Sequence, residues 1–275
     1  MNYKIGIIGT GGSWYNIIPD PLIENKGESF SIELLENRIV NFPFTHFDRS
    51  ITSISYIETA IAAQDSGFDA VFINTFGDYG IDSIRSALDI VVVGAGEASM
   101  SVSSNLAKNF SIVTLWPPKL NFIYQERLLN SGQNSKCVSI RNILRDDSIS
   151  AINSASNSIN HMNSSNSPTV KDIIHEIELA ISEDGAEAIL LGCTCMAKVA
   201  DKISKSVDIP VIEPMRTGYK TTEMILSLGL KHSIYSFPKT NQSHLSHLNT
   251  ILGGVDSISN DKEVNYCILD DESEN

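Results

Sequence analysis

One cysteine of this chain stands in a setting that suits acid/base chemistry. Cys193 directly follows an apolar run at residues 188–191 and Gly192, and a helix is expected to begin just after it. Backbone N–H groups and the positive end of a helix lower the pKa of a thiol, which makes the thiolate accessible near neutral pH. A thiolate can remove a proton from carbon, and the thiol can return one. The sequence therefore predicts Cys193 as the principal acid/base residue.

The other cysteines lack this combination of strand end, glycine neighbour and helix start. Cys137 and Cys267 are interpreted as small buried hydrophobic side chains. Cys193 and Cys195 form a C-x-C pair, but a structural zinc site needs about four ligands. The sequence offers no second pair, so no metal is predicted. Four scattered cysteines without a secretion signal are too few for a disulfide framework, and we therefore expect free thiols.

An internal repeat gives Cys193 a counterpart in the first half of the chain. Residues 66–75 align without a gap to residues 184–193, and both segments read as a helix end, a Gly turn, an acidic residue with Ala, and a buried strand. Two similar βαβ units imply two lobes in which the carboxyl ends of equivalent strands face each other across a crevice. Thr75 is then opposed to Cys193. The alternative is a chance likeness between two ordinary βαβ units.

Short apolar runs rich in Val and Ile alternate with longer amphipathic stretches, which is the pattern of parallel strands joined by helices. Six runs are predicted as strands: residues 4–8, 70–73, 90–93, 111–114, 188–191 and 211–212. The Ser- and Asn-rich stretch at residues 146–169 is predicted as a surface loop. From His232 onward, polar residues and the acidic end at residues 270–275 predict a solvated tail.

The fold class that these patterns predict is α/β. We expect two flavodoxin-like lobes with parallel sheets, related by a pseudo-twofold axis, and an active site in the cleft between them. Residues 1–95 together with residues 213–235 are expected to form the first lobe, and residues 96–212 the second. Residues 236–275 are assigned to a C-terminal extension whose acidic end is expected to be disordered.

Composition and charge exclude several classes of function. A hydrophobic share of 42% and a charged share of 19% in 275 residues indicate a globular protein rather than a disordered chain. The formal net charge of −13 repels phosphate backbones, so nucleic acid is not expected as a partner. No signal-peptide pattern follows Met1, and no apolar run approaches the roughly 18 residues of a membrane span. We therefore expect a cytoplasmic protein without a membrane partner.

The first predicted strand ends in a turn that is rich in backbone donors. The turn reads Gly9-Thr10-Gly11-Gly12-Ser13, and it suits a carboxylate or imide oxygen. It lacks the full G-x-G-x-x-G pattern, so a dinucleotide cofactor is not supported. Gly11, Gly12 and Ser13 are therefore predicted to bind the substrate.

Several of these segments resemble the aspartate/glutamate/hydantoin racemase superfamily. The strand followed by Gly192-Cys193-Thr194 is similar to the second cysteine motif of that superfamily. Residues 76–80 resemble the segment after the first cysteine in hydantoin racemases, and residues 93–98 and 110–114 also resemble that branch. The Gly-rich turn, in contrast, is more similar to that of aspartate racemases. The resemblance extends over roughly residues 4–228.

In that superfamily two cysteines flank the α-carbon of the substrate. One thiolate removes its proton and the opposite thiol donates another, without a cofactor. The resemblance carries Cys193 over directly, whereas Thr75 stands where the first cysteine is expected. Sliding the register to fit the Cys-Asn-Thr motif of aspartate racemases would put Ile73 at that position and break the repeat, so Thr75 is preferred.

A threonine hydroxyl is a far weaker acid than a thiol, so racemisation by two thiols is not available here. Three hypotheses remain. Thr75 relays a proton, or Cys193 acts alone as in the related arylmalonate decarboxylases, or the site binds its ligand without turnover. The leading hypothesis is racemisation or epimerisation at the carbon α to a carbonyl.

The predicted partner is a small carboxylate or a hydantoin-type molecule. Asn74, Phe76 and Gly77 are predicted to contact it from one lobe, and Thr194 and Cys195 from the other. Donors at these positions would stabilise the enolate oxygen that forms when the α-proton leaves. No cofactor is predicted, and homo-oligomerisation is left open.

Overall fold

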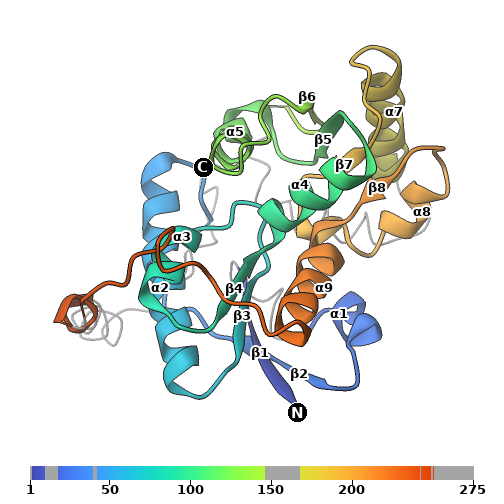
Figure 1. Cartoon of the computed structure of the whole chain (residues 1–275). Helices are drawn as coiled ribbons and strands as arrows, with labels where there is room; N and C mark the ends of the chain where they lie inside the picture. Colours follow the sequence, from blue (N-terminus) through green and yellow to red (C-terminus); the bar gives the residue numbers. More distant parts are fainter. Residues whose placement is uncertain are drawn as a thin grey trace, which may run out of the picture.

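The computed structural model describes residues 2–9, 18–39, 42–145, 168–241, 243–248 and 250. Within these residues the chain forms two parallel β-sheets with helices packed around them (Figure 1). The strands of the first sheet are β1 (Tyr3–Ile8), β2 (Phe30–Leu35), β3 (Ala70–Ile73) and β4 (Val91–Gly94). Those of the second are β5 (Phe110–Thr114), β6 (Cys137–Asn142), β7 (Ile189–Leu191) and β8 (Val211–Ile212).

The two sheets have the same topology. Their strand orders are β2-β1-β3-β4 and β6-β5-β7-β8, and every pair is parallel. β3 and β7 therefore occupy equivalent places, as the internal repeat predicts. The predicted fold class, α/β with two lobes built on parallel sheets, is confirmed.

The first sheet is covered on both faces, which explains why its central strands are apolar throughout. Successive side chains of β3 point to opposite faces: Val71 and Ile73 pack with Tyr56, while Phe72 packs with Tyr219. The helices around this sheet are α1 (Asp20–Asn25), α2 (His46–Asp65), α3 (Ile81–Ala87) and α9 (Pro214–Ser227). Tyr56 belongs to α2 and Tyr219 to α9, so these two helices lie on opposite faces.

The second sheet is built in the same way. Ile189 and Leu191 of β7 pack with Ile177, while Leu190 packs with Tyr124 on the other face. The helical segments of this lobe are α4 (Ala95–Leu106), η1 (Pro118–Leu120), α5 (Asn121–Asn130), α7 (Pro168–Ser182), η3 (Thr194–Met196) and α8 (Ala200–Ser204), where η marks a 3₁₀ turn. Ile177 lies on α7 and Tyr124 on α5.

Two helices and one loop connect the lobes. α9 follows β8 of the second sheet and packs against β3 and β4 of the first, and α4 packs along α9 and also contacts α5, β7 and β8 (Figure 1). Phe76, in the loop after β3, is buried within the core of the second lobe. The carboxyl ends of β3 and β7 are therefore held close to the junction between the lobes.

Two expectations about the secondary structure are wrong. The structure contains eight described strands, whereas six are predicted, and the two missing from the prediction are β2 and β6. Both are edge strands, and both are only half-buried, so their sequences mix polar with apolar residues. Residues 146–167 of the predicted surface loop lie outside the described residues, and the helix α7 already begins at Pro168.

The described part of the segment that follows α9 is mostly exposed, but several of its residues contact the first lobe. His232 accepts a hydrogen bond at Nε2 from the backbone N–H of Val92, at 2.8 Å. Lys239 forms an ion pair with Asp89 at 3.1 Å, and Leu248 packs against the first-lobe core. β4 is an edge strand whose outward N–H groups need an acceptor, and this segment supplies one. The acidic end, residues 270–275, lies outside the described residues.

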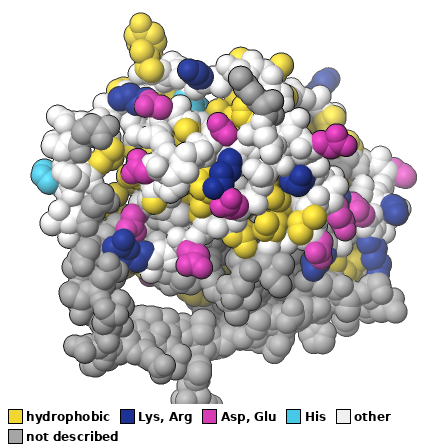
Figure 2. Space-filling view, turned by 90° about the horizontal axis from the view of Figure 1, so that it is seen from below, with side chains coloured by type: hydrophobic (Ala, Val, Ile, Leu, Met, Phe, Trp, Pro, Cys, Tyr) yellow, Lys and Arg dark blue, Asp and Glu magenta, His cyan; other side chains and the backbone are white. Residues whose placement is uncertain are grey.

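On the face of the molecule shown in Figure 2, Lys and Arg side chains are interspersed with Asp and Glu side chains. The ion pairs of the described residues include Lys4–Glu33 at 3.0 Å and Lys220–Glu223 at 2.7 Å. Among the helices that the structure describes, none combines the length and the apolar character that a membrane span requires.

Candidate active site

Gly192 fixes the place of Cys193 at the end of β7. Its N–H donates to the carbonyl of Val113 at 2.8 Å, which continues the β5–β7 pairing by one residue. A Cβ at Gly192 would lie 2.6 Å from Cβ of Thr114, so only glycine fits this close approach. The strand thus delivers Cys193 to the carboxyl edge of the second sheet, where α/β folds bind their ligands.

The same bonding pattern is found at the end of β3. The N–H of Asn74 donates to the carbonyl of Ile8 at 2.7 Å, just as Gly192 donates to Val113. Asn74 is therefore the structural counterpart of Gly192, and Thr75 is the counterpart of Cys193. Ile73, the alternative first-cysteine position, is fully buried within β3. The gapless register of the repeat is confirmed.

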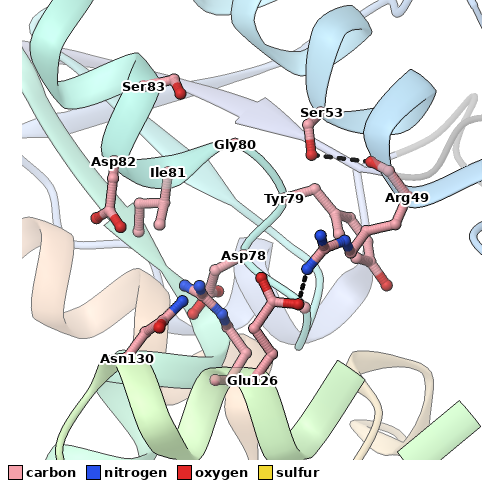
Figure 3. Close-up of a pocket in the computed structure, with 12 residues that line it drawn as sticks. Arg49, Ser53, Asp78, Tyr79, Gly80, Ile81, Asp82, Ser83, Glu126 and Asn130 are labelled. Carbon is pink, nitrogen blue, oxygen red and sulfur yellow. Dashed lines mark hydrogen bonds and ion pairs between the residues drawn. The ribbon is translucent and has the colours of Figure 1, made fainter. Parts of the chain in front are cut away.

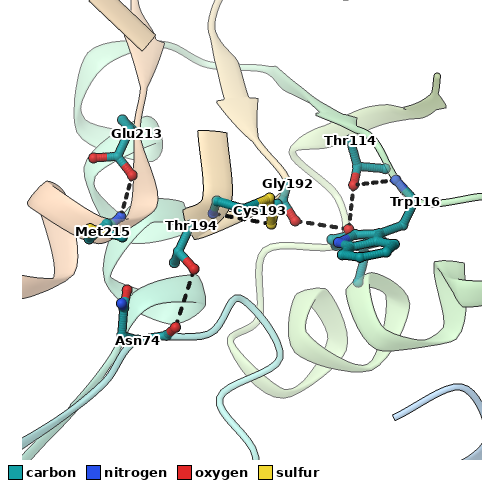
Figure 4. Close-up of a disulfide and its surroundings, with 10 residues drawn as sticks. Asn74, Thr114, Trp116, Gly192, Cys193, Thr194, Glu213 and Met215 are labelled. Atoms are coloured by element: carbon teal, nitrogen blue, oxygen red, sulfur yellow. Dashed lines mark hydrogen bonds between the residues drawn. A yellow bond between two sulfur atoms is a disulfide. The ribbon is translucent and has the colours of Figure 1, made fainter. Parts of the chain in front are cut away.

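The two strand ends are in contact with each other. The hydroxyl of Thr194 donates to the carbonyl of Asn74 at 3.2 Å, which links the residue after Cys193 to the residue before Thr75 (Figure 4). The structure therefore brings together two predicted site residues from opposite lobes, Asn74 and Thr194.

Three buried polar atoms beside this contact have no hydrogen-bond partner among the described residues. They are the amide oxygen and nitrogen of Asn74 and the hydroxyl of Thr75. Asn74 is 0% exposed and Thr75 7% exposed. Leaving a buried polar group unpaired costs about 1–3 kcal/mol, so such groups in a folded protein call for a partner. An unpaired donor and acceptor at the junction of the two lobes are suited to hydrogen-bond a ligand.

Cys193 and Cys195 are joined by a disulfide (Figure 4). The expectation of free thiols is therefore wrong for this pair, although Cys137 is free. The count of scattered cysteines overlooked that the 3₁₀ turn after β7 brings the two Cα atoms to 5.1 Å, within the usual range for a disulfide. In this state the sulfur of Cys193 cannot accept a proton, so its predicted acid/base role requires the reduced pair.

The backbone around Cys193 is arranged to stabilise a thiolate when the pair is reduced. The N–H of Cys195 points at Sγ of Cys193, at 3.2 Å, and both cysteines are partly exposed. An N–H donor favours the ionised form of a thiol. Cys137 has the opposite environment, because its burial raises the pKa of the thiol to about 11 and its Sγ–H donates to the carbonyl of Ser139.

Tyr124 is a site residue that the sequence did not reveal. Its buried hydroxyl donates to the carbonyl of Gly192 at 2.8 Å and lies 2.5 Å from the hydroxyl of Thr114. Burial raises the pKa of Tyr124, so the phenol stays neutral and remains a donor. Tyr124 lies on α5 among the core residues of the second lobe, and nothing in the sequence indicates that its hydroxyl reaches the residue before Cys193.

Phe76 and Gly77 have structural roles beside the predicted site. The ring of Phe76 is 5% exposed and packs edge-on against Tyr124, with ring centroids 5.0 Å apart. This side chain therefore joins the lobes, and only its backbone is left for contact with a ligand. At Gly77 a Cβ would lie 2.3 Å from the ring of Tyr79, so no side chain fits. The predicted contacts Gly11, Gly12 and Ser13 lie outside the described residues.

Asp78 anchors the loop that carries Thr75. Its carboxylate accepts hydrogen bonds from the N–H groups of Gly96 at 2.9 Å and Glu97 at 2.7 Å, in the first turn of α4. Burial, followed by the charge of Glu97, raises the pKa of Asp78 to about 8, against the lowering effects of Arg127 and the two amides. Asp78 adopts a left-handed backbone with φ of 45°, which its two bonds to α4 hold in place.

Glu213 is a second buried acid near Cys193, and it follows β8 (Figure 4). Its carboxylate accepts from the N–H groups of Met215 at 2.6 Å and Arg216 at 2.9 Å, so it caps α9. Burial raises the pKa of Glu213, while these bonds and the Arg216 guanidinium lower it. Its acceptor oxygens are thus occupied, and we assign it a structural role.

A cavity of about 210 Å³ lies between α2, α3 and α5 (Figure 3). Arg49 and Glu126 line it and form an ion pair with each other, and Asp78 and Tyr79 form part of its wall. Of the predicted site residues only Gly77 lines it, so this cavity is separate from the surroundings of Cys193. Within the described ranges, no group of three or more His, Cys, Asp or Glu side chains is placed to hold a metal ion.

Comparison with known proteins identifies relatives over most of the chain. The family model for Asp/Glu/hydantoin racemase matches residues 31–222. The hydantoin racemase of Paenarthrobacter aurescens is 30% identical over 188 residues, which is 68% of this chain and 74% of the relative. The hydantoin racemase of Pseudomonas sp. (strain NS671) is 29% identical over 203 residues, 72% of this chain and 76% of the relative.

Solved structures share the fold. The allantoin racemase from Pseudomonas fluorescens has a TM-score of 0.73 at 22% identity, over 86% of this chain and 97% of its own. The allantoin racemase from Klebsiella pneumoniae has a TM-score of 0.70 at 24% identity, over 87% of this chain and 95% of its own. Unliganded arylmalonate decarboxylase has a TM-score of 0.55 at 13% identity, over 81% of this chain and 92% of its own. The comparisons therefore do not favour the lyase hypothesis.

The family match covers more than half of the chain, and it includes both strand ends that form the candidate site. The resemblance inferred from residues 76–80 and 192–194 is therefore confirmed. The chain belongs to the Asp/Glu/hydantoin racemase family, and it is an isomerase that acts on a small molecule.

Proposed function

We propose that this racemase inverts the carbon α to a carbonyl in a hydantoin-type ring, with Cys193 and Thr75 on opposite faces of that carbon. The observation that carries the proposal is the set of unpaired atoms at the end of β3, the Asn74 amide and the Thr75 hydroxyl. A hydantoin ring presents alternating N–H and C=O groups, and a primary amide offers the complementary acceptor and donor. The relatives named hydantoin racemase support the same substrate class.

The charge of these groups also favours a ring over a free amino acid. Asn74, Thr75 and Thr194 are neutral, and the atoms left unpaired among them carry no formal charge. An α-amino acid brings an ammonium and a carboxylate, each of which needs a charged or strongly polar partner when it is desolvated. A neutral ring does not impose that cost. We therefore place hydantoin-type substrates ahead of amino acids.

In the proposed mechanism the reduced Cys193 thiolate removes the α-proton, and the electron pair moves onto the adjacent carbonyl oxygen. The amide nitrogen of Asn74 and the backbone N–H of Thr194 stabilise the developing enolate. Thr75 then supplies a proton to the opposite face of the ring. No described side chain is hydrogen-bonded to the Thr75 hydroxyl, so a water molecule supplies the replacing proton in the same step and no free alkoxide forms.

The test uses single enantiomers of 5-substituted hydantoins and of amino acids, incubated in heavy water with fully reduced protein. We expect deuterium at the α-carbon and loss of optical activity with hydantoins, and much slower exchange with amino acids. Release of carbon dioxide from a malonate-type substrate would instead identify a lyase. If the reduced protein binds hydantoins but exchanges none of their α-protons, the proposal is wrong.

The proposed chemistry also bears on location. A thiolate base at Cys193 has to remain reduced, and cytoplasmic thiols are kept reduced by thioredoxin and glutathione. We therefore propose a cytoplasmic enzyme. Fractionation of cells that express the native gene, with detection by an antibody, tests this, and recovery of the protein outside the cytoplasm would contradict it.

A further inference from the structure

The disulfide at the end of β7 occupies the residue on which the proposed function depends. We propose that Cys193 and Cys195 form a reversible dithiol–disulfide pair, and that its oxidation by a peroxide or a small disulfide turns off proton transfer by Cys193. The inference rests on the proposed function, because it concerns the same sulfur atom. It adds a modification site and assigns Cys195 the role of resolving cysteine.

The position of the pair argues against a purely structural disulfide. A disulfide stabilises a fold mainly by constraining the unfolded chain. This stabilisation becomes smaller as the loop that the disulfide closes becomes shorter. Cys193 and Cys195 are separated by a single residue, so the loop is among the shortest available. The turn is already held by two hydrogen bonds. The Met196 N–H donates to the Cys193 carbonyl at 3.1 Å, and the Thr194 hydroxyl donates to the Asn74 carbonyl. Both redox states are therefore expected to fold.

The two sulfur atoms are accessible, and they differ in reactivity. Both residues are partly exposed, so a small oxidant can reach them. The N–H of Cys195 points at Sγ of Cys193, which favours the thiolate at Cys193 and makes it the first to react. Cys137 lies on the edge strand β6, where its Sγ–H donates to the carbonyl of Ser139, and it has no second described cysteine to pair with.

The chemistry balances with a two-electron oxidant. The Cys193 thiolate attacks hydrogen peroxide, breaks its O–O bond and becomes a sulfenic acid, with release of hydroxide. The Cys195 thiolate then attacks the sulfenic sulfur, forms the S–S bond and releases a second hydroxide. Two thiols and one peroxide thus give one disulfide and two waters. With glutathione disulfide, two successive exchanges give the same bond and two molecules of glutathione.

The functional consequence follows from the site. In the disulfide, Sγ of Cys193 has no ionisable proton, so it can neither take up the α-proton nor return it. The bonds that Tyr124 makes to Gly192 and Thr114 are present together with the disulfide, so the surrounding network does not depend on reduction. The oxidised enzyme is therefore folded and inactive, and a dithiol reductant restores it.

The test compares the parent, Cys195→Ala and the control Cys137→Ser, each normalised to its own α-proton exchange when fully reduced. Separate samples receive hydrogen peroxide or glutathione disulfide and are then analysed by alkylation in denaturant and by mass spectrometry. The parent and Cys137→Ser should form the 193–195 disulfide, lose about 10²-fold or more of their exchange rate, and recover with dithiothreitol. Cys195→Ala should instead accumulate a sulfenic acid or a mixed glutathione disulfide at Cys193.

The outcomes separate this inference from the proposed function. An oxidised parent that carries the 193–195 disulfide and still exchanges α-protons at the reduced rate would overturn redox control and also the role of Cys193 as the base. A parent that oxidises without forming this disulfide would overturn redox control alone. A reduced parent that exchanges no α-proton would overturn the proposed function, and redox control of it as well.

Discussion

The phenol of Tyr124 offers the sharpest test of how the fold positions Cys193. Tyr124→Phe removes one hydroxyl from a buried network, while the ring keeps its packing against Phe76. The carbonyl of Gly192 then loses its donor at 2.8 Å, and the hydroxyl of Thr114 loses a partner at 2.5 Å but keeps the Trp116 N–H at 3.3 Å.

The magnitude follows from these contacts. A buried carbonyl left unpaired costs about 1–3 kcal/mol, and the partly compensated Thr114 hydroxyl adds about 0.5–1 kcal/mol. Tyr124→Phe should therefore lower the free energy of unfolding by about 2–3 kcal/mol, which corresponds to a Tm decrease of about 5–10 °C. The double variant with Thr114→Val should cost less than the sum of the single changes, because the two hydroxyls share one bond.

The assay is urea unfolding of the reduced protein together with steady-state kinetics on a hydantoin. Because Gly192 directly precedes Cys193, we expect kcat to fall by about tenfold or more while KM changes little. Tyr235→Phe is the matched control, since Tyr235 is 90% exposed and should change stability by less than about 0.5 kcal/mol. If Tyr124→Phe matches the parent in both urea midpoint and kcat, the network does not position Cys193 and the reasoning fails.

Three further predictions concern the sulfur atoms, the opposite face and the C-terminal segment. In the reduced protein iodoacetamide should label Cys193 well before Cys137, whose thiol pKa is raised to about 11 by burial; peptide mapping that finds Cys137 labelled first would contradict the site assignment. Thr75→Ala should slow racemisation by about 10²-fold. Thr75→Cys should accelerate it, because a thiol has a pKa nearer to the working pH than a hydroxyl has. Inversion is followed by chiral chromatography, and inversion by Thr75→Ala at the rate of the parent would exclude the relay. Burial lowers the pKa of His232 to about 4, against roughly 6.5 in an unfolded chain, so its contribution to stability is present above pH 6.5 and is lost as the pH falls towards 4. His232→Gln keeps an acceptor for Val92 without titrating, and its urea midpoint should therefore fall less than that of the parent between pH 7 and pH 4.5; equal losses would refute this role.

The central strands and the repeat can be predicted from the sequence because burial on both faces of the sheet requires apolar residues in these strands. β3 and β7 are continuous apolar runs, and the repeat found at residues 66–75 and 184–193 coincides with equivalent places in two sheets of the same order. The resemblance to the racemase family depended on the turns that follow these strands. Such turns can be recognised because the positions of Gly192 and Asn74 are set by backbone pairing with the neighbouring strand rather than by side-chain contacts.

Features that depend on distant contacts could not be predicted. β2 and β6 are half-buried edges, so they lack the apolar run that marks a central strand. The segment around His232 is polar, and only the three-dimensional structure shows that Val92 donates to it. The link between Tyr124 and Gly192 spans 68 residues of sequence. Periodicity gives the face of a helix on which a residue lies, but it does not give the partner of a hydroxyl.

The repeat also explains why the proposed mechanism needs Thr75 although the site contains two sulfur atoms. In the gapless register Cys195 is the counterpart of Gly77, where a Cβ would already lie 2.3 Å from the Tyr79 ring. The first lobe therefore has no room for a cysteine at that position, and both sulfur atoms of the site come from the second lobe. A second thiol on the same lobe can form a disulfide with Cys193, but it cannot protonate the opposite face of a planar enolate. In the proposed mechanism, inversion then depends on the first lobe, where Thr75 carries the unpaired hydroxyl.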